Sequence, residues 1–321
     1  MRALILHQEI DKASAADDAD VLIQTDQVAA ALRQLGHAVE IFPVTLNLTA
    51  LKTILEEQKP DFCFNLVESL DGSGQYLHFV PALLERLQIP FTGSGAQALY
   101  LSTDKILSKE RLQGIGVATP AWALGIDPSL PMPCIIKPIN EDASVDIDEE
   151  MVVFSQPELV ARMQKTRAGR RYFCEQFITG REFNISIIAK AHGPQVLPPA
   201  EMLFLDYPPD KPQIVGYRAK WQNDSFEFKH TVRRFDYPPE DDNLLQQLTE
   251  ISLECWSAFQ LHGYARVDFR VDQKGRPWVL EINANPCISP DSGFIAATSR
   301  AGLSFEHVIQ QIVADAIPRI L

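Results

Sequence analysis

The sequence predicts an α/β protein of two or more lobes, the first of which is built on a small parallel sheet. At 321 residues the chain exceeds the roughly 250 to 300 residues at which a single hydrophobic core usually stops growing. Its N-terminal part alternates short β-rich runs with helical patterns, which is the order of a parallel sheet covered by helices.

Hydrophobic spacing and turn residues delimit the elements of the N-terminal part. In chain order we expect a strand at Ala3–Leu6, a helix at Thr25–Leu35 closed by Gly36, a strand at Val39–Phe42, a helix at Leu48–Gln58, a strand at Asp61–Leu66, a helix at Gln75–Leu87 and a strand at Ile89–Gly93. We assign residues 1–98 to this N-terminal α/β domain.

The middle of the chain is expected to form a small central lobe, residues 99–180. A helix is predicted at Thr103–Gln113, and a change of lobe falls near the prolines of 120–131. The apolar strand Cys134–Ile136 then leads directly to a lysine, Lys137.

Two strands at the end of this lobe are predicted to pair as a hairpin. They are Tyr172–Phe177 and Glu182–Ala189, and they flank the turn-like pair Thr179–Gly180. The third domain, residues 181–321, is expected to begin within this hairpin.

The C-terminal domain contains a long polar segment followed by a second hairpin. Pro198–Asp236 has few periodic signals, so we expect a long loop with short strands, of the kind that often forms a functional lid. A helix at Asp241–Gln260 precedes strands at Ala265–Val271 and Trp278–Asn283, which Asp272–Gly275 joins.

The composition excludes several classes of protein. A formal charge of -13 opposes nonspecific binding to nucleic acid and to anionic membranes, which need clustered Lys and Arg. No stretch approaches the ~18 apolar residues that span a bilayer, and the N-terminus lacks the pattern of a signal peptide. We expect a cytoplasmic protein that binds neither nucleic acid nor membranes.

The five cysteines give no sign of a metal or redox site. They are odd in number, far apart and free of any C-x-x-C pair. We therefore expect structural thiols in a reducing compartment.

The second predicted hairpin gathers polar side chains on one face. In a strand alternate side chains share a face, so Arg266, Asp268 and Arg270 point one way, and Glu281 and Asn283 share a face of the partner strand. Two carboxylates and an amide oxygen suit Mg²⁺, although a solvent-facing polar side of an ordinary sheet has the same alternation.

The apolar residues between these polar positions predict that the other face of the hairpin is core. These residues are Val267, Phe269, Leu280 and Ile282.

Several strings of this sequence resemble the D-alanine:D-alanine ligase family of the ATP-grasp superfamily. They run in the expected order from about residue 61 to residue 297, and they include Phe64-Asn65-Leu66-Val67, Ile89-Pro90-Phe91-Thr92-Gly93-Ser94, Asp104-Lys105, Ile136-Lys137-Pro138, Glu175-Gln176-Phe177-Ile178-Thr179-Gly180-Arg181-Glu182, Gly263-Tyr264-Ala265-Arg266-Val267-Asp268-Phe269 and Leu280-Glu281-Ile282-Asn283-Ala284-Asn285-Pro286. The resemblance implies an ATP-grasp fold behind the N-terminal parallel lobe.

The resemblance also implies ATP as cosubstrate and Mg²⁺ as the metal, with Mn²⁺ as an alternative ion. Lys105 and Lys137 match the two family lysines on the nucleotide phosphates. Glu175 matches the residue at the adenine amino group, and Glu182 matches the carboxylate that binds ribose. Backbone contacts and an apolar wall are implied for Gln176, Phe177 and Ile178.

The catalytic and metal positions match as well. Asp268, Glu281 and Asn283 would hold Mg²⁺ against the phosphates, and Arg266 would stabilise the oxyanion during acyl transfer. The other two positions assigned to catalysis are Ser144 and Lys220.

Three features depart from the family pattern where the donor substrate binds. The phosphate-covering loop, Glu141–Asp146, has lost its glycines, and Ala143 replaces a serine that helps to fix the first D-alanine. Trp221 stands where the family has a tyrosine. The family's N-terminal glycine pair and glutamate have no counterpart around residues 8–20.

The acceptor end is unchanged, because Ser292 matches the serine that binds the carboxylate of the incoming amino acid. We therefore expect a carboxylate-amine ligase that joins a donor other than D-alanine to an amino acid acceptor. The altered residues are compatible with a larger donor, such as a peptide, and the substrates are small carboxylates and amino acids or peptides. Alternatives are an authentic D-alanine:D-alanine ligase, a non-catalytic ATP-binding module and a kinase. The resemblance implies a homodimer.

Overall fold

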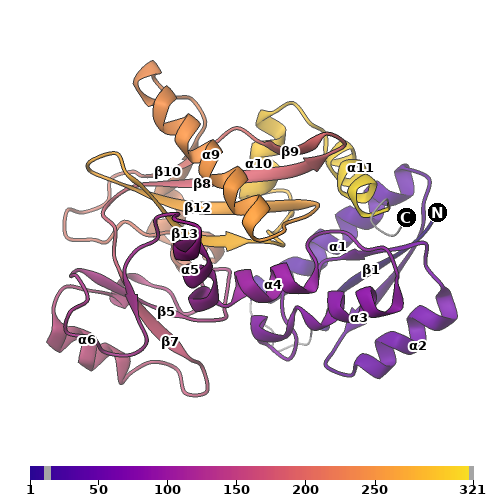
Figure 1. The fold of residues 1–321 in the computed structure, drawn as a ribbon, viewed down its shortest axis with the longest axis horizontal. Coiled ribbons are helices and arrows are strands. Elements are labelled where there is room, and N and C mark those ends of the chain that lie inside the picture. The colour runs from indigo at the N-terminus through magenta and orange to yellow at the C-terminus, as the bar shows by residue number, and fades with distance from the viewer. Residues whose placement is uncertain (11–15, 318–321) are drawn as a thin grey trace.

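Three sheets and the helices around them form the protein, of which a computed structural model describes residues 1–10 and 16–317. The N-terminal sheet, the middle sheet and the large C-terminal sheet lie in different parts of the molecule (Figure 1). No helix among the described residues is both long enough and apolar enough to cross a membrane.

The N-terminal sheet is parallel, as the alternating pattern predicts. Its strands have the order β2-β1-β3, with helices between them. The elements are β1 (Arg2–Gln8), α1 (Ala16–Gln34), β2 (Ala38–Val44), α2 (Leu48–Gln58), β3 (Phe62–Asn65), the 3-10 turn η1 (Gly74–Tyr76) and α3 (Phe79–Leu87).

Three predictions in this part need correction. The helix expected at 25–35 is the longer α1, Ala16–Gln34. The helix expected at 75–87 is divided into η1 and α3. The strand expected at 89–93 is a single parallel bridge between Cys63 and Phe91, because the chain turns away at Gly93, whose φ is +82°.

The middle sheet is small and antiparallel, with the order β4-β7-β5-β6. Two helices lead into it, and Asp104 both ends the first and caps the second through bonds from the main-chain nitrogens of Ile106 and Leu107. The elements are α4 (Ala96–Thr103), α5 (Lys105–Gly114), β4 (Trp122–Ala123), β5 (Cys134–Pro138), η2 (Glu149–Met151), β6 (Val152–Val153), α6 (Gln156–Met163) and β7 (Tyr172–Gln176).

The large sheet is antiparallel, with the order β11-β10-β8-β12-β13 and β9 beside β8. Apolar side chains of α9 pack with those of β8, β12 and β13 in one core, whereas α10 and α11 share a core with α1 and β1. The elements are β8 (Gly180–Lys190), β9 (Gly193–Val196), β10 (Ala200–Phe204), α7 (Tyr217–Trp221), α8 (Phe226–His230), β11 (Thr231–Arg234), η3 (Pro239–Asp241), α9 (Asp242–Ala258), β12 (Tyr264–Asp272), β13 (Pro277–Asn283), α10 (Gly293–Arg300) and α11 (Phe305–Ala316).

The predicted hairpin around residues 179–180 is wrong. β7 pairs with β4 and β5 of the middle sheet, whereas β8 pairs with β9, β10 and β12 of the large sheet. The chain passes from one sheet to the other at Gly180, which has a φ of +148°. A Cβ atom there would lie 2.0 Å from the main-chain oxygen of Val271, so glycine is required by the close approach of β12.

The hairpin of β12 and β13 is confirmed, with one correction. Asp268 lies opposite Glu281, and Arg266 lies opposite Asn283. A bulge follows Asp268, so Val279 rather than Leu280 enters the core, and Leu280 lines a cavity instead.

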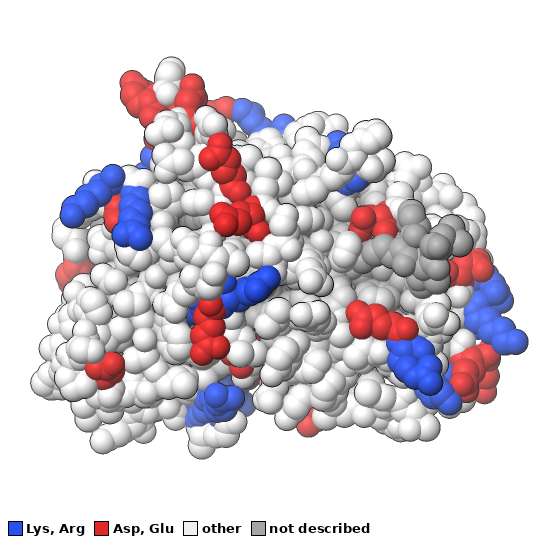
Figure 2. Space-filling view, viewed as in Figure 1, with Lys and Arg blue, Asp and Glu red and all other residues white. Residues whose placement is uncertain are grey.

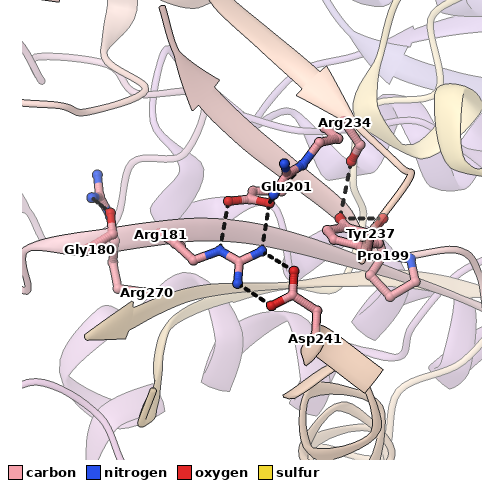
Figure 3. Close-up of polar contacts among 8 residues, drawn as sticks. All are labelled: Gly180, Arg181, Pro199, Glu201, Arg234, Tyr237, Asp241 and Arg270. Atoms are coloured by element: carbon pink, nitrogen blue, oxygen red, sulfur yellow. Dashed lines mark hydrogen bonds and ion pairs between the residues drawn. The ribbon is translucent and has the colours of Figure 1, made fainter. Parts of the chain in front are cut away.

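A network of ion pairs ties down the start of β8 (Figure 3). Arg181 forms two bonds to Glu201 of β10 and two to Asp241 just before α9. Arg234 of β11 also bonds to Glu201. These contacts join three strands and a helix immediately after the crossing between the sheets.

Charged side chains of both signs are scattered over the face seen in Figure 2. Its described residues form no broad basic surface, and the lack of nucleic-acid partners stays a prediction. All five cysteines are free thiols, four of them buried.

Candidate functional site

A cavity of about 540 Å³ lies between the middle sheet and the large sheet and is lined by residues of both, together with Asp20 of α1 and Glu68 after β3. This volume is in the usual range for small-molecule sites. Of the site residues predicted from sequence, it is lined by Lys137, Ser144, Glu175, Gln176, Phe177, Ile178, Glu182, Lys220, Trp221, Arg266, Asp268, Glu281, Asn283 and Ser292. Lys105 lies behind this wall, with its Nζ 3.8 Å from Glu281.

At the end formed by the middle sheet, Glu175 is held between two lysines. Its Oε2 lies 2.5 Å from Nζ of Lys109, and its Oε1 pairs with Nζ of Lys137. Burial alone would raise the pKa of Glu175, but the two ammonium groups outweigh it and lower that pKa. The carboxylate is therefore ionised and directed at lysines, so a contact with adenine would fall to other atoms of this segment.

Glu182 also has a partner that sequence reasoning assigned no role. Arg270 Nη2 lies 2.6 Å from Oε2 of Glu182, and both side chains are nearly buried. Burial raises the pKa of Glu182, while Arg270 opposes the rise. The alternation in β12 indicated the face of Arg270, but not its partner on β8.

The polar face of the hairpin is held by hydrogen bonds to Asp268. Arg266 donates two bonds to it, of 2.7 and 2.8 Å, and Asn184 and Asn283 donate one each. Burial raises the pKa of Asp268 despite Arg266. For Glu281 burial acts in the same sense, but Lys105 and two further lysines overcome it and hold its pKa low.

These donors fit Mg²⁺, because they are two carboxylates and an amide on facing strands. In residues 1–10 and 16–317 no three His, Cys, Asp or Glu side chains form a metal-binding group. An ion held here would therefore need the amide oxygen of Asn283 and oxygens of a substrate or water.

Lys220 of α7 lines this cavity, and its side-chain ammonium group forms no hydrogen bond or ion pair with another described residue. Burial and the neighbouring charge of Arg266 lower the pKa of Lys220, while Glu281, Asp268 and Glu182 oppose that effect. An anionic ligand would relieve the repulsion between the two cations.

The loop at 141–146, whose residues 141–144 line the cavity, has an uncommon backbone conformation. Ala143, Ser144 and Asp146 all have positive φ, near 60°, which costs a non-glycine residue about 1 to 2 kcal/mol. Nζ of Lys105 donates to the main-chain oxygen of Glu141 at 2.6 Å, and the Ser144 hydroxyl donates to that of Val215 at 2.7 Å. The loop thus keeps left-handed backbone without its glycines because side chains fasten it.

The opposite end of the cavity contains groups that the sequence did not indicate. Asp20, Glu68 and Arg233 line it together with Ser292. No counterpart of the family's glycine pair and glutamate was expected around residues 8–20; that stays a prediction, although Asp20 of this segment lines the cavity. Residues 11–15 of that segment lie outside the described residues. The Ser292 hydroxyl caps α10 by accepting a bond from the main-chain nitrogen of Ile295.

Comparison with known proteins places this chain among ligases. The family model described as D-ala D-ala ligase C-terminus matches residues 113–314, more than half of the chain. D-alanine--D-alanine ligase B of Pseudomonas putida is 31% identical over 279 residues, which cover 82% of this chain and 79% of that protein. The uncharacterized protein y4sG of Sinorhizobium fredii is 29% identical over 300 residues, covering 90% of this chain and 85% of that one.

A solved structure has the same fold. The D-alanine--D-alanine ligase of Bacillus anthracis, complexed with ATP, superimposes with a TM-score of 0.75 at 22% identity, covering 100% of this chain and 98% of that one. This likeness confirms the predicted ATP-grasp fold with its parallel N-terminal lobe.

Proposed function

This chain belongs to the D-alanine–D-alanine ligase family, and we propose that its cavity binds ATP, activates a carboxylate as an acyl phosphate and joins the acyl group to an amino acid. Enzymes of this family are ATP-dependent ligases that form C–N bonds. The observation that supports the proposal most strongly is the meeting, in one cavity, of predicted site residues from the middle sheet and the large sheet.

The nucleotide would lie against the middle sheet. Lys137 and Lys105 are the cations for its phosphates, and Gln176, Phe177 and Ile178 supply the wall for adenine. Glu182, held by Arg270, would accept hydrogen bonds from ribose. The crossing at Gly180 brings these residues close to the polar face of the hairpin.

Asp268, Glu281 and Asn283 would hold Mg²⁺. The ion supplies positive charge that lowers the cost of phosphoryl transfer. Arg266 and Lys220 are cations placed to stabilise negative charge on the acyl group as an amine attacks its carbon and phosphate leaves. The hydrogen bonds from Arg266 fix its orientation before substrate arrives.

We infer that the donor is not D-alanine. Ala143 lacks the hydroxyl of the serine that it replaces, and the larger Trp221 lies directly beside it. Asp20 and Glu68 at the far end supply negative charge, which favours a donor that carries an amino group. The acceptor carboxylate would bind near Ser292 and Arg233.

The test is phosphate release from ATP and Mg²⁺ across a panel of amino acids and dipeptides, alone and in pairs. Glu281→Gln is the inactive variant, and the exposed Glu57→Gln on α2 is its matched control. Turnover that requires two substrates, persists in Glu57→Gln and disappears in Glu281→Gln supports ligation. Turnover with one carboxylate alone, yielding a stable phosphorylated product, would indicate a kinase instead.

The same panel decides the donor. D-alanine with D-alanine as the best pair would overturn the inference that the donor has changed, while leaving the ligase function intact. The homodimer stays a prediction, which light scattering of the purified protein checks.

A further inference from the structure

Helix α5 carries two buried lysines one turn apart, Lys105 and Lys109. Residues four apart lie on the same side of a helix. Lys105 faces the loop at 141–146 and Glu281. Lys109 faces Glu175 and has no role in the function proposed above.

Lys109 is fixed from two directions. Its Nζ lies 2.5 Å from Oε2 of Glu175 and donates to the hydroxyl of Thr119 at 2.9 Å. The Thr119 hydroxyl in turn donates to the main-chain oxygen of Val279 in β13 at 2.8 Å. The Lys109 side chain is 1% exposed, and it does not contribute to the cavity wall.

The charges of Lys109, Lys137 and Glu175 do not sum to zero. Glu175 has one negative charge and pairs with two ammonium groups, those of Lys109 and Lys137. Of the two, only Lys137 reaches the cavity. A single lysine would suffice to neutralise the buried carboxylate, so the second leaves the cluster with a net positive charge.

We propose that Lys109 is a positioning residue for phosphate binding, which neutralises Glu175 so that the charge of Lys137 stays available to the nucleotide phosphates. The inference rests on the proposed function, in which Lys137 contacts ATP. Without Lys109, Glu175 and Lys137 would form a closed neutral pair. Nucleotide phosphates would then have to compete with a buried carboxylate for the same ammonium group.

A purely structural role for Lys109 gives a different expectation. Buried ion pairs seldom stabilise a fold more than apolar groups of similar shape. If the role of Lys109 is only structural, its replacement would change the free energy of unfolding and would change the affinities for all ligands of the folded protein alike. Under the proposed role, its replacement would lower the affinity more for ligands whose phosphates carry more negative charge.

The experiment measures, by calorimetric titration, binding of a non-hydrolysable ATP analogue and of adenosine to the full-length protein. In Lys109→Met, affinity for the triphosphate should fall roughly tenfold or more, while affinity for adenosine stays within about twofold. The double variant Lys109→Met with Glu175→Gln removes both charges and leaves Lys137 unpaired. It should recover triphosphate affinity to within about threefold of the wild type.

Equal losses for adenosine and the triphosphate, or no loss for either, would overturn the inference. If Lys109→Met fails to fold, the double variant decides alone, since a neutral pair replaces the buried ions. Weak triphosphate binding by the folded double variant, with normal adenosine binding, would contradict the proposed charge balance. A wild-type protein that binds neither ligand would instead overturn the nucleotide-binding function, and this inference with it.

Discussion

Trp221 Nε1 donates a hydrogen bond of 2.9 Å to the main-chain oxygen of Ala143. Two of the positions that depart from the family pattern are thus in direct contact, although 198–236 and 141–146 are distant in sequence. The bond closes α7 over the left-handed backbone of the loop. The loop and α7 therefore form one connected part of the cavity lining.

This contact leads to a prediction about donor specificity. Exchanging Trp221→Tyr together with Ala143→Ser should raise kcat/KM for D-alanine as donor by roughly tenfold, because a smaller ring and a new hydroxyl restore a polar site for a small substrate. Phosphate release with D-alanine measures the change, and each single variant is the control. No increase in the double variant would remove the support for this donor pocket.

A second prediction concerns the stability of the pair formed by Arg270 and Glu182. Both side chains are almost buried, so Arg270→Met leaves the Glu182 carboxylate buried without its ion-pair partner. The free energy of unfolding should fall by about 3 to 5 kcal/mol, as measured by urea denaturation. Arg270→Met combined with Glu182→Gln should recover most of the loss, and a double variant as unstable as the single one would contradict this explanation.

A third prediction follows from the network in Figure 3. Hydrogen bonds from Arg181 lower the pKa of Asp241 below the ordinary value of 3.8, although its partial burial acts the other way. A depressed pKa in the folded state stabilises the protein above the unfolded value, and this contribution is lost as the pH falls through the folded value.

The free energy of unfolding of Asp241→Asn should therefore be lower than that of the wild type, by an amount that is constant from pH 7 to about pH 5. The difference should shrink as the pH falls below 3.8. Denaturant titrations at several pH values measure it, with the exposed neighbour Asp242→Asn as control. A difference that is independent of pH would show that charge is not its cause.

Local patterns in the sequence predicted the fold well where neighbours in sequence are also neighbours in space. The hairpin of β12 and β13 is an example, because its alternation and its turn are read from one short stretch. Leu280 was wrongly assigned to the core because the alternation of polar and apolar residues does not reveal a β-bulge. The hairpin at 179–180 was wrong because the positive φ of Gly180 serves a crossing between sheets and not a turn.

The candidate site could be predicted as a set of residues, but not as a set of contacts. Resemblance indicated Glu175 and Glu182, yet their partners Lys109 and Arg270 lie far away in sequence. In the sequence alone, a lysine in a helix and an arginine in a strand cannot be distinguished from ordinary surface residues. Burial of both charges, which requires the structure, distinguishes these residues from others of their type.

The last prediction tests whether the crossing at Gly180 depends on the absence of a side chain. Gly180→Ala places a Cβ atom 2.0 Å from the Val271 oxygen, and that strand also presents Arg270, which donates to the oxygen of Gly180. The free energy of unfolding of Gly180→Ala should be lower than that of the wild type by about 3 kcal/mol or more. Gly193→Ala is the matched control, since Gly193 also has a positive φ of +117° but no atom within 4 Å of its Cβ position, and it should lose only about 1 kcal/mol. Equal losses in both variants, measured by urea denaturation, would mean that backbone conformation alone, rather than the close approach of β12, requires glycine at the junction of the sheets.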